Sequence, residues 1–346
     1  MRTVLAAGDH FIRPEAMEAA LREEVHTDLD VRRLTLPWPH TPFGPVGEVT
    51  EASGTEEELV AALDGVPICV TQMAPFTEKV LTACPDLELV CVGRGGPLNV
   101  NVEAATRCGV AVCYAPGRNA TATAEHALAL MLAAARRVPE LHIEMASGFW
   151  RGDYYAYDNV GFELGGATIG LVGYGAVGRR VARVLRALDA TVIVYDPYAS
   201  FGEQDDVEAV TTLDELLARS RVVSLHARAT PETAGMIGAA QLAAMPQGAV
   251  LINCARGSLV DEEAVCDAIE TGHLFAAGFD VFTHEPVPPS SRLLTTRHVV
   301  MTPHVAGASR EVAHKAARIM ATEVGRYVRG EPLVHWLNLE AVRART

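Results

Sequence analysis

The sequence contains no apolar run long enough to cross a membrane as a helix. The longest that we find spans residues 127–135 and is followed directly by Arg136 and Arg137. A membrane-spanning helix needs about 20 consecutive apolar residues, roughly twice this length. We therefore interpret the run as part of a buried helix and expect no membrane partner.

Basic residues are scarce relative to acidic ones. The chain of 346 residues carries 29 lysines and arginines against 43 aspartates and glutamates, which gives a formal net charge of -14. A chain with this balance is repelled by nucleic acids and by anionic membrane surfaces. We expect its partners to be small molecules and not nucleic acids.

The cysteines lack the spacing of a metal or redox centre. There are 7, an odd number, and no two of them form a Cys-x-x-Cys pair, so we expect no bound metal. No apolar leader follows Met1, because strand-like residues begin almost at once. Reduced thiols in a cytoplasmic chain fit this pattern best.

The apolar residues, by contrast, are plentiful, and their pattern predicts α/β structure. They make up 49% of the chain, enough for the cores of two domains. In the first third, short β-branched runs alternate with helical segments, which is typical of a parallel sheet covered by helices. The strands predicted there are residues 4–7, 68–71, 89–92 and 110–114, with helices at 56–63 and 102–108.

The alternation resumes after a long helix, which we predict over residues 121–147. Six strands follow, as many as a complete doubly wound sheet contains. A final helix at residues 309–329 has no place in that sheet, so we expect it to return to the first domain. The six predicted strands are residues 168–172, 191–195, 222–226, 249–253, 276–280 and 298–302.

A glycine-rich loop follows the first of these six strands. The motif Gly173-x-Gly175-x-x-Gly178 lies directly between this strand and a helix, which is the context of a dinucleotide-binding loop. Gly173 permits a tight turn, Gly175 lets the backbone approach a pyrophosphate, and Gly178 lets helix and strand pack closely. The helix N-terminus adds partial positive charge.

Asp196 ends the next strand, near the spacing expected of a carboxylate that binds the adenosine ribose. A carboxylate there repels a 2′-phosphate, and no arginine occurs in residues 198–201, so NAD is favoured over NADP. The sequence thus predicts two doubly wound parallel-sheet domains. A Rossmann NAD-binding domain at 117–308 is inserted in a flavodoxin-like substrate-binding domain, residues 1–116 plus 309–346.

Polar residues that follow the later strands suggest a reaction. Open parallel sheets bind ligands beyond the carboxyl ends of their strands, where the sequence places Arg256, Glu285 and His304. Hydride transfer from a 2-hydroxy acid needs a base for the hydroxyl proton and a cation for the carboxylate. His304 suits the base, Glu285 can orient its ring, and Arg256 can hold the acid. Any one of them alone is more often structural, but the three together favour catalysis.

The motifs around these three residues also resemble a known family. Asn253-x-Ala-Arg-Gly, Asp280-Val-Phe-x-x-Glu-Pro and Thr302-Pro-His-x-Ala-Gly are similar to the D-isomer-specific 2-hydroxyacid dehydrogenases, phosphoglycerate dehydrogenase-like members in particular. The likeness extends over residues 89–309. It implies an NAD-dependent oxidoreductase that interconverts a small D-2-hydroxy acid and its 2-oxo acid. It further implies that Arg256, Glu285 and His304 are catalytic, that the active site lies between two domains, and that the protein forms a homodimer.

The residues expected to contact NAD lie in the glycine loop and at the ends of the following strands. They are Gly173, Tyr174, Gly175, Ala176, Val177, Gly178, Asp196, Pro197, His226, Ala227, Cys254, Ala255, Arg256, Asp280, His304, Ala306 and Gly307. The substrate is expected to contact Arg94, Gly95, Gly96, Arg256 and His304.

Several points stay open in the sequence. The loop that begins at Gly95 is shorter than the family's Gly-x-Gly-x-Asp-Asn, which leaves the identity of the acid open. Arg94, Arg107 and Arg118 make a phosphate or another second anionic group on the substrate conceivable. Arg228 either adds positive charge near the cofactor or is a solvated surface side chain.

Two other functions are compatible with the sequence. Proteins that resemble this family serve as non-catalytic, NAD-sensing corepressors, although the complete set of three residues argues against that role. Formate or phosphite oxidation on the same fold needs no pocket for a prochiral carbonyl. We interpret His126 as a packing or capping histidine. The aromatic segment 149–157 lines either the mouth of the active site or a subunit interface, and we favour the interface because buried aromatic side chains dominate such contacts.

Overall fold

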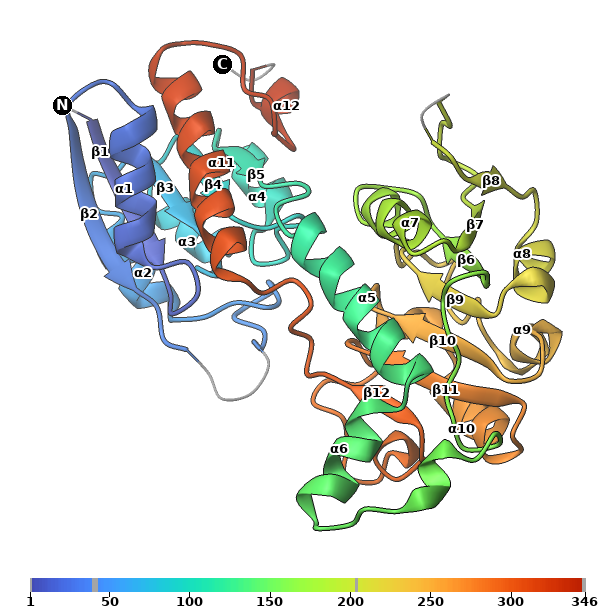
Figure 1. Cartoon of the computed structure of the whole chain (residues 1–346). Coiled ribbons are helices and arrows are strands. Elements are labelled where there is room, and N and C mark those ends of the chain that lie inside the picture. The colour runs from blue at the N-terminus through green and yellow to red at the C-terminus, as the bar shows by residue number, and fades with distance from the viewer. Residues whose placement is uncertain (1, 39–42, 203–204, 344–346) are drawn as a thin grey trace. The chain divides into compact units, whose positions relative to one another are not determined.

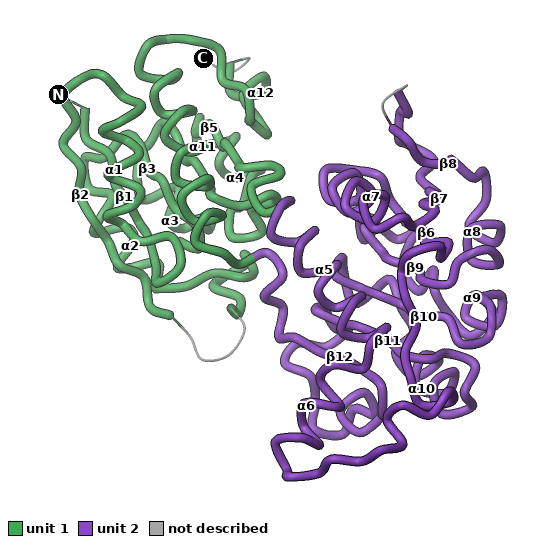
Figure 2. Tube along the Cα trace, in the orientation of Figure 1, with its two compact units in different colours: residues 1–119, 308–346 green, residues 120–307 purple. Residues whose placement is uncertain are grey.

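The computed structural model describes residues 2–38, 43–202 and 205–343. The chain divides into two compact units, which Figure 2 distinguishes by colour. Unit 1 contains residues 1–119 and 308–346, and unit 2 contains residues 120–307. Unit 2 is therefore inserted in the chain of unit 1. None of the helices within the described ranges combines the length and the apolar character that crossing a bilayer requires.

Unit 1 is built on a five-stranded parallel sheet with the strand order β2-β1-β3-β4-β5, the flavodoxin-like order. Apolar side chains form a separate core on each face of this sheet, and helices cover both cores (Figure 1). The strands are β1 (Arg2–Gly8), β2 (Leu29–Thr35), β3 (Ile68–Thr71), β4 (Leu89–Val92) and β5 (Ala111–Tyr114). The helices are α1 (Pro14–Glu24), α2 (Glu56–Ala62), α3 (Glu78–Ala83), α4 (Val102–Arg107), α11 (Arg310–Val328) and α12 (Leu339–Arg343).

Helix α11 is the element that returns the chain to unit 1 after unit 2. It packs against α1 and contributes Ala316, Met320 and Val324 to the core that covers one face of the sheet. Its buried Glu323 accepts hydrogen bonds from the backbone N–H groups of Val334 and His335. These bonds hold the segment that follows the helix against unit 1.

Unit 2 has a seven-stranded parallel sheet with the order β12-β11-β10-β9-β6-β7-β8. This order, with helices between successive strands, confirms the predicted doubly wound fold. The strands are β6 (Thr168–Val172), β7 (Thr191–Tyr195), β8 (Glu208–Ala209), β9 (Val222–Leu225), β10 (Ala249–Asn253), β11 (Leu274–Phe279) and β12 (Val299–Met301). The helices are α5 (Ala120–Ala135), α6 (Val138–Ala146), α7 (Gly178–Ala187), α8 (Leu213–Arg219), α9 (Ala239–Ala244) and α10 (Glu262–Glu270).

Two strands that the sequence did not reveal lie at sheet edges. β2 pairs only with β1, and its residues Arg32 and Arg33 are exposed. β8 is an exposed strand of two residues that pairs only with β7. An edge strand has one neighbour and less buried surface, so it lacks the continuous apolar run of a central parallel strand.

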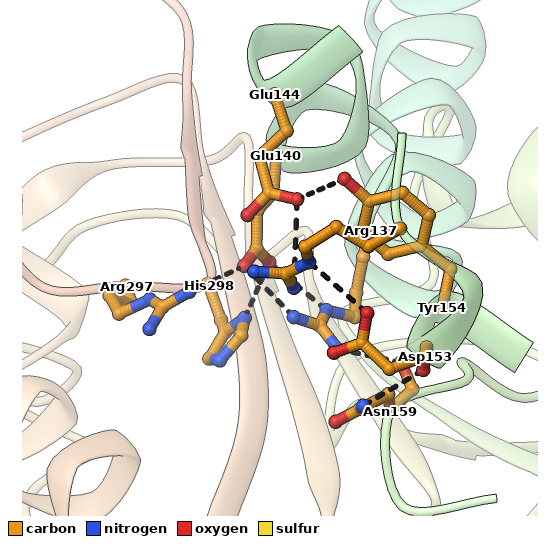
Figure 3. Close-up of polar contacts among 9 residues, drawn as sticks. Arg137, Glu140, Glu144, Asp153, Tyr154, Asn159, Arg297 and His298 are labelled. Carbon is orange, nitrogen blue, oxygen red and sulfur yellow. Dashed lines mark hydrogen bonds and ion pairs between the residues drawn. The ribbon is translucent and has the colours of Figure 1, made fainter. Parts of the chain in front are cut away.

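The prediction of one long helix over residues 121–147 was wrong, because the structure contains two helices with a break between them. Arg137 has a left-handed backbone with φ of 56°, and Pro139 follows in the first turn of α6, where a missing N–H group is tolerated. The Arg137 guanidinium donates two hydrogen bonds to Glu140 and one, of 2.6 Å, to the carbonyl oxygen of Asn159 (Figure 3).

Glu140 is the centre of the polar cluster in Figure 3. Besides Arg137, it contacts Arg297 at 3.0 Å and the Nδ1 atom of His298 at 3.0 Å. Burial raises the pKa of Glu140, but the hydrogen bond from Arg137 and the neighbouring positive charges outweigh burial and lower this pKa to about 2. The cluster therefore ties α6 to the start of β12 through a charged carboxylate.

We predict that this carboxylate makes the stability of unit 2 sensitive to acid. Because its pKa is lower in the folded chain than the ordinary value of 4.5, its contribution is complete above that value and is lost as the pH falls toward 2. Glu140→Gln should lower the unfolding temperature at pH 7, and the gap to the wild type should shrink below pH 4.5. Glu163→Gln, at an exposed position in unit 2, is the control. A pH-independent gap for Glu140→Gln would contradict the prediction.

Candidate active site

The glycine loop joins the carboxyl end of β6 to α7. Gly173 has a φ of 100°, a backbone conformation that favours glycine. A Cβ atom there would lie 2.7 Å from the backbone carbon of His226. A Cβ at Gly178 would lie 2.3 Å from the carbonyl oxygen of Gly173. These two glycines therefore let the loop pack tightly against its surroundings.

Gly175 differs from the other two glycines, because a Cβ there would meet nothing within 4 Å. Gly175 and Ala176 are exposed, and Val177 precedes the first residue of α7. The open space thus lies directly before a helix N-terminus, where backbone N–H groups and the helix dipole attract an anion. This arrangement fits the pyrophosphate of a dinucleotide.

Asp196 follows β7 and faces the glycine loop. Its Oδ2 atom accepts a hydrogen bond of 2.7 Å from the backbone N–H of Tyr174, and its Oδ1 atom accepts one of 2.9 Å from the backbone N–H of Tyr198. A carboxylate can accept about four hydrogen bonds, so acceptor capacity remains for ribose hydroxyls. Pro197, the next residue, is exposed.

His226, Ala227 and Cys254, which are among the residues expected to contact NAD, lie in the loops after β9 and β10. His226 donates its backbone N–H to Val172, and burial lowers the pKa of its ring to about 4, so the ring is neutral at pH 7. Ala227 is half-buried, and Arg228 is exposed as a surface side chain. Burial raises the pKa of the Cys254 thiol, which therefore stays protonated.

His304 and Glu285 are in direct contact. The Nδ1 atom of His304 lies 2.7 Å from Oε2 of Glu285, and the other carboxylate oxygen accepts a hydrogen bond from the backbone N–H of Phe282. The side chain of His304 is 48% exposed. One ring nitrogen is thus fixed by a carboxylate, and the Nε2 atom remains to exchange a proton.

Asp280 holds the loop that carries His304. Its buried carboxylate accepts hydrogen bonds from the hydroxyl of Thr302 and from the backbone N–H groups of Val305 and Ala306. Its carbonyl oxygen accepts a hydrogen bond of 2.8 Å from the N–H of His304. This one residue therefore fixes the backbone on both sides of the histidine. Gly307, which follows Ala306, is half-buried.

Arg256 lies in the loop after β10, which packs against the loop of Glu285. The side chain of buried Asn253 donates to the carbonyl oxygen of Arg256 and accepts a hydrogen bond from the N–H of buried Ala255. A Cβ at Gly257 would lie 2.0 Å from the backbone carbon of Phe282, so the two loops touch through their backbones. The side chain of Arg256 makes no ion pair with any described residue and bonds only to the carbonyl oxygen of Ala255.

The remaining predicted substrate residues lie in unit 1, after β4. Gly95 and Gly96 are exposed, with nothing within 4 Å of an added Cβ. The guanidinium of Arg94 is bound by the side chain and the backbone carbonyl of Glu51. Arg107 forms an ion pair with Glu78 at 2.5 Å.

Some supporting contacts of the site had little or no signal in the sequence. His126 hydrogen-bonds the Thr302 hydroxyl at 2.8 Å and so joins α5 to the network of Asp280. The sequence analysis interpreted His126 as a packing or capping residue and did not predict this contact. The contact depends on Thr302, which is distant in the sequence. Asn253 ends β10 and Thr302 directly follows β12. For both residues, this position at the end of a strand was the feature of the sequence that could have indicated a role in the site.

Comparisons with known proteins identify the family of this chain. Residues 128–306 match the family model for the NAD binding domain of D-isomer specific 2-hydroxyacid dehydrogenases. The D-3-phosphoglycerate dehydrogenase of Archaeoglobus fulgidus is 38% identical over 83% of this chain and 54% of its own length. A glyoxylate reductase of Korarchaeum cryptofilum is 37% identical over 78% of this chain and 82% of its own length. The chain belongs to the D-isomer-specific 2-hydroxyacid dehydrogenase family.

A solved structure extends the likeness to both units. A crystal structure of a protein from Thermus thermophilus matches with a TM-score of 0.78 at 30% identity, over 97% of this chain and 100% of that one. The chain spans about half the length of the curated D-3-phosphoglycerate dehydrogenases that it matches. NAD is the cofactor of the matched domain, and the open space at Gly175 and the carboxylate of Asp196 fit it.

We predict that alanine substitutions at two glycines of the loop affect different properties, stability at one and NADH affinity at the other. Gly178→Ala should lower the unfolding temperature, because the new Cβ meets a backbone oxygen at 2.3 Å. Gly175→Ala should unfold like the wild type but bind NADH about tenfold or more weakly, roughly 1.4 kcal/mol. Differential scanning fluorimetry and NADH fluorescence titration separate the two effects. Unchanged NADH affinity in Gly175→Ala would show that the pyrophosphate lies elsewhere.

Proposed function

We propose that this chain is an NAD-dependent dehydrogenase that interconverts a small D-2-hydroxy acid and its 2-oxo acid. The observation that carries this proposal is the His304–Glu285 pair, with a contact of 2.7 Å at the edge of a dinucleotide-binding sheet. A histidine fixed through one nitrogen by a carboxylate is suited to general acid–base work. The family membership agrees with this assignment.

In the direction of reduction, His304 acts as the acid. Its Nδ1 atom faces Glu285, so Nε2 donates the proton to the carbonyl oxygen of the 2-oxo acid. The carboxylate of Glu285 keeps the ring in this orientation. In oxidation the same nitrogen takes the hydroxyl proton, since the reaction is reversible.

Arg256 binds the carboxylate of the acid. Its guanidinium is free of any ion pair with the described residues and offers parallel N–H donors that match a carboxylate. Arg94, Gly95 and Gly96 of unit 1 are proposed as further substrate contacts, with Gly95 and Gly96 offering exposed backbone.

The cofactor is proposed to lie along the carboxyl ends of the unit 2 strands. The glycine loop holds the pyrophosphate and Asp196 binds the ribose, while the ends of β9, β10 and β11 line the nicotinamide half. When bound, NAD accepts or supplies the hydride. Asp280 acts as a positioning residue for the loop of His304.

We predict that His304→Ala keeps NADH affinity but lowers kcat by about 10²–10⁴-fold, the usual contribution of a general acid–base group. NADH absorbance, followed with a panel of 2-oxo acids, measures the turnover. The matched control is His284→Ala, which removes an exposed histidine from the same loop as Glu285 and should leave turnover intact.

The outcome of the same assay separates the alternatives. Unchanged turnover in His304→Ala would refute the role of this residue. Tight NADH binding by the wild type without oxidation by any 2-oxo acid would instead favour an NAD-sensing scaffold. Turnover confined to formate or phosphite in the oxidative direction would favour those anions as substrates.

We further propose that the chain forms a homodimer through α6 and the segment after it, which includes the short 3-10 helix η1 (Gly152–Tyr155). Helix α6 has no buried residue although it is largely apolar. Large apolar patches of this kind mark contacts with another protein surface, and a second copy of this arm offers the same apolar character. The exposed side chains are Val138, Ile143, Met145, Phe149, Trp150, Tyr155 and Tyr157.

We predict that Ile143→Glu combined with Trp150→Glu gives a monomer in sedimentation velocity, because two charges would be buried against the partner's apolar surface. Leu294→Glu, also at an exposed apolar position of unit 2, is the control and should leave the mass of the particle unchanged. A dimer that survives the double substitution would exclude this arm as the interface.

We propose that the protein is located in the cytoplasm. We also propose that its partners are small acids and that it binds neither nucleic acids nor membranes. The 7 cysteines are free thiols, and all except Cys108 are buried, which supports a reducing environment. The net charge of -14 supports the choice of small-molecule partners.

A further inference from the structure

An arginine of α7 lies against the segment that follows Asp196. Arg179 belongs to the first turn of α7, directly after Gly178 of the glycine loop. Its Nη2 atom donates a hydrogen bond of 2.6 Å to the carbonyl oxygen of Ser200. Residues 198–201 themselves contain no arginine, so this cation is brought to the segment by the fold and is not one of its neighbours in the sequence.

The place of Arg179 bears on which dinucleotide unit 2 prefers. In Rossmann domains a carboxylate binds the ribose 2′-hydroxyl of NAD, whereas a nearby arginine accommodates the 2′-phosphate of NADP. Unit 2 contains both groups close to Tyr174, whose N–H donates to Asp196 and whose ring centre lies 4.4 Å from the guanidinium carbon of Arg179. The hydrogen bond to Asp205 is the main cause that raises the pKa of Arg179, and the charge of Asp196 adds to it. Asp196 and Arg179 are therefore within electrostatic reach of each other.

Asp205 neutralises this arginine. Both of its carboxylate oxygens lie 2.6 Å from Nη1 of Arg179, and no other acidic side chain within the described ranges forms an ion pair with Arg179. The hydrogen bond from Arg179 lowers the pKa of Asp205 to about 2, so the carboxylate is ionised at pH 7. Charge-assisted hydrogen bonds of this kind are stronger than those between neutral groups. The cation is thus occupied before any cofactor binds.

Further contacts keep Asp205 in place. Its Oδ1 atom accepts a hydrogen bond of 3.1 Å from the hydroxyl of Tyr174, and its Oδ2 atom accepts one of 2.9 Å from the N–H of Gly202. Tyr174 is buried, and the ring of Phe201 stacks on it with the two centroids 5.3 Å apart. An ion pair between two solvated side chains contributes little, but this one is held by the packing around Tyr174.

We propose that Asp205 is a second determinant of the preference for NAD, because it holds Arg179 in an ion pair and so keeps that cation from a 2′-phosphate. This inference rests on the cofactor position proposed above, but it does not depend on which acid reacts. Asp196 disfavours NADP by repelling the phosphate, whereas Asp205 occupies the guanidinium that would otherwise bind it. A phosphate could take the place of Asp205 only by breaking the ion pair and leaving this carboxylate without its cation.

The test measures the dissociation constants of NADH and NADPH by fluorescence titration. The wild type should prefer NADH. Asp205→Asn keeps much of the side-chain volume without the charge, and should raise the affinity for NADPH relative to that for NADH about tenfold, roughly 1.4 kcal/mol. Arg179→Met should keep the wild-type ratio, because its charge is already neutralised. In the double variant the gain should disappear, since the cation that binds the phosphate is gone.

Asp206→Asn is the matched control. Asp206 is the next residue in the chain and pairs with Arg186 of the same helix, so its replacement changes the net charge by the same amount. It should keep the wild-type ratio of the two dissociation constants. An unchanged ratio in Asp205→Asn would overturn the inference, and so would an equal gain in Asp206→Asn or in the double variant that lacks Arg179.

Two further measurements separate this role from a structural one and from the cofactor position. Differential scanning fluorimetry without cofactor reports the fold, and Asp205→Ser, which also lacks the charge, takes the place of Asp205→Asn if that variant unfolds. A lower unfolding temperature with an unchanged ratio would leave Asp205 a structural role only and refute the inference. Asp196→Asn should weaken NADH binding. If it does not, the proposed cofactor position fails together with the inference. If it does while the Asp205 variants keep the wild-type ratio, only the role of Asp205 is refuted.

Discussion

The chemistry of unit 2 depends on one buried carboxylate, that of Asp280. It accepts hydrogen bonds from two backbone N–H groups and a hydroxyl of the loop after β12. These bonds determine where the imidazole of His304 lies. A buried carboxylate is costly unless hydrogen bonds satisfy it. The loop satisfies Asp280, and Asp280 in turn fixes the loop, so fold and site depend on the same bonds. His126 extends the network to α5.

Four central strands, β3, β4, β6 and β10, were predicted to the residue, whereas the edge strands β2 and β8 were missed. β3, β4, β6 and β10 are buried throughout or nearly so, and such strands appear in the sequence as short apolar runs between turns. β8 is exposed and forms only through its pairing with β7. The break between α5 and α6 escaped prediction because it depends on bonds from Arg137 to Glu140 and to the distant Asn159.

The same distinction applies to the candidate site. Arg256, Glu285 and His304 were proposed from the sequence because each follows a strand at the edge where ligands of parallel sheets bind, and the structure brings Glu285 and His304 into contact. Their supports could not all be found, because the contact between His126 and Thr302 joins residues far apart in the chain. Nor could the sequence tell Arg118 from Arg94 and Arg107. Arg94 and Arg107 form ion pairs with Glu51 and Glu78, whereas Nε and Nη1 of Arg118 have no hydrogen-bond partner among the described residues.

The close approach of Gly257 to the backbone of Phe282 constrains how this site can change. No side chain separates the two loops, so neither can shift without carrying the other along. The positions of Arg256 and Glu285 are thus coupled. A chain that lengthens or reorients one loop would alter the proposed binding of the acid and the orientation of the proposed proton donor together. Gly95 and Gly96 of unit 1 are under no such constraint, because an added Cβ at either position meets nothing within 4 Å.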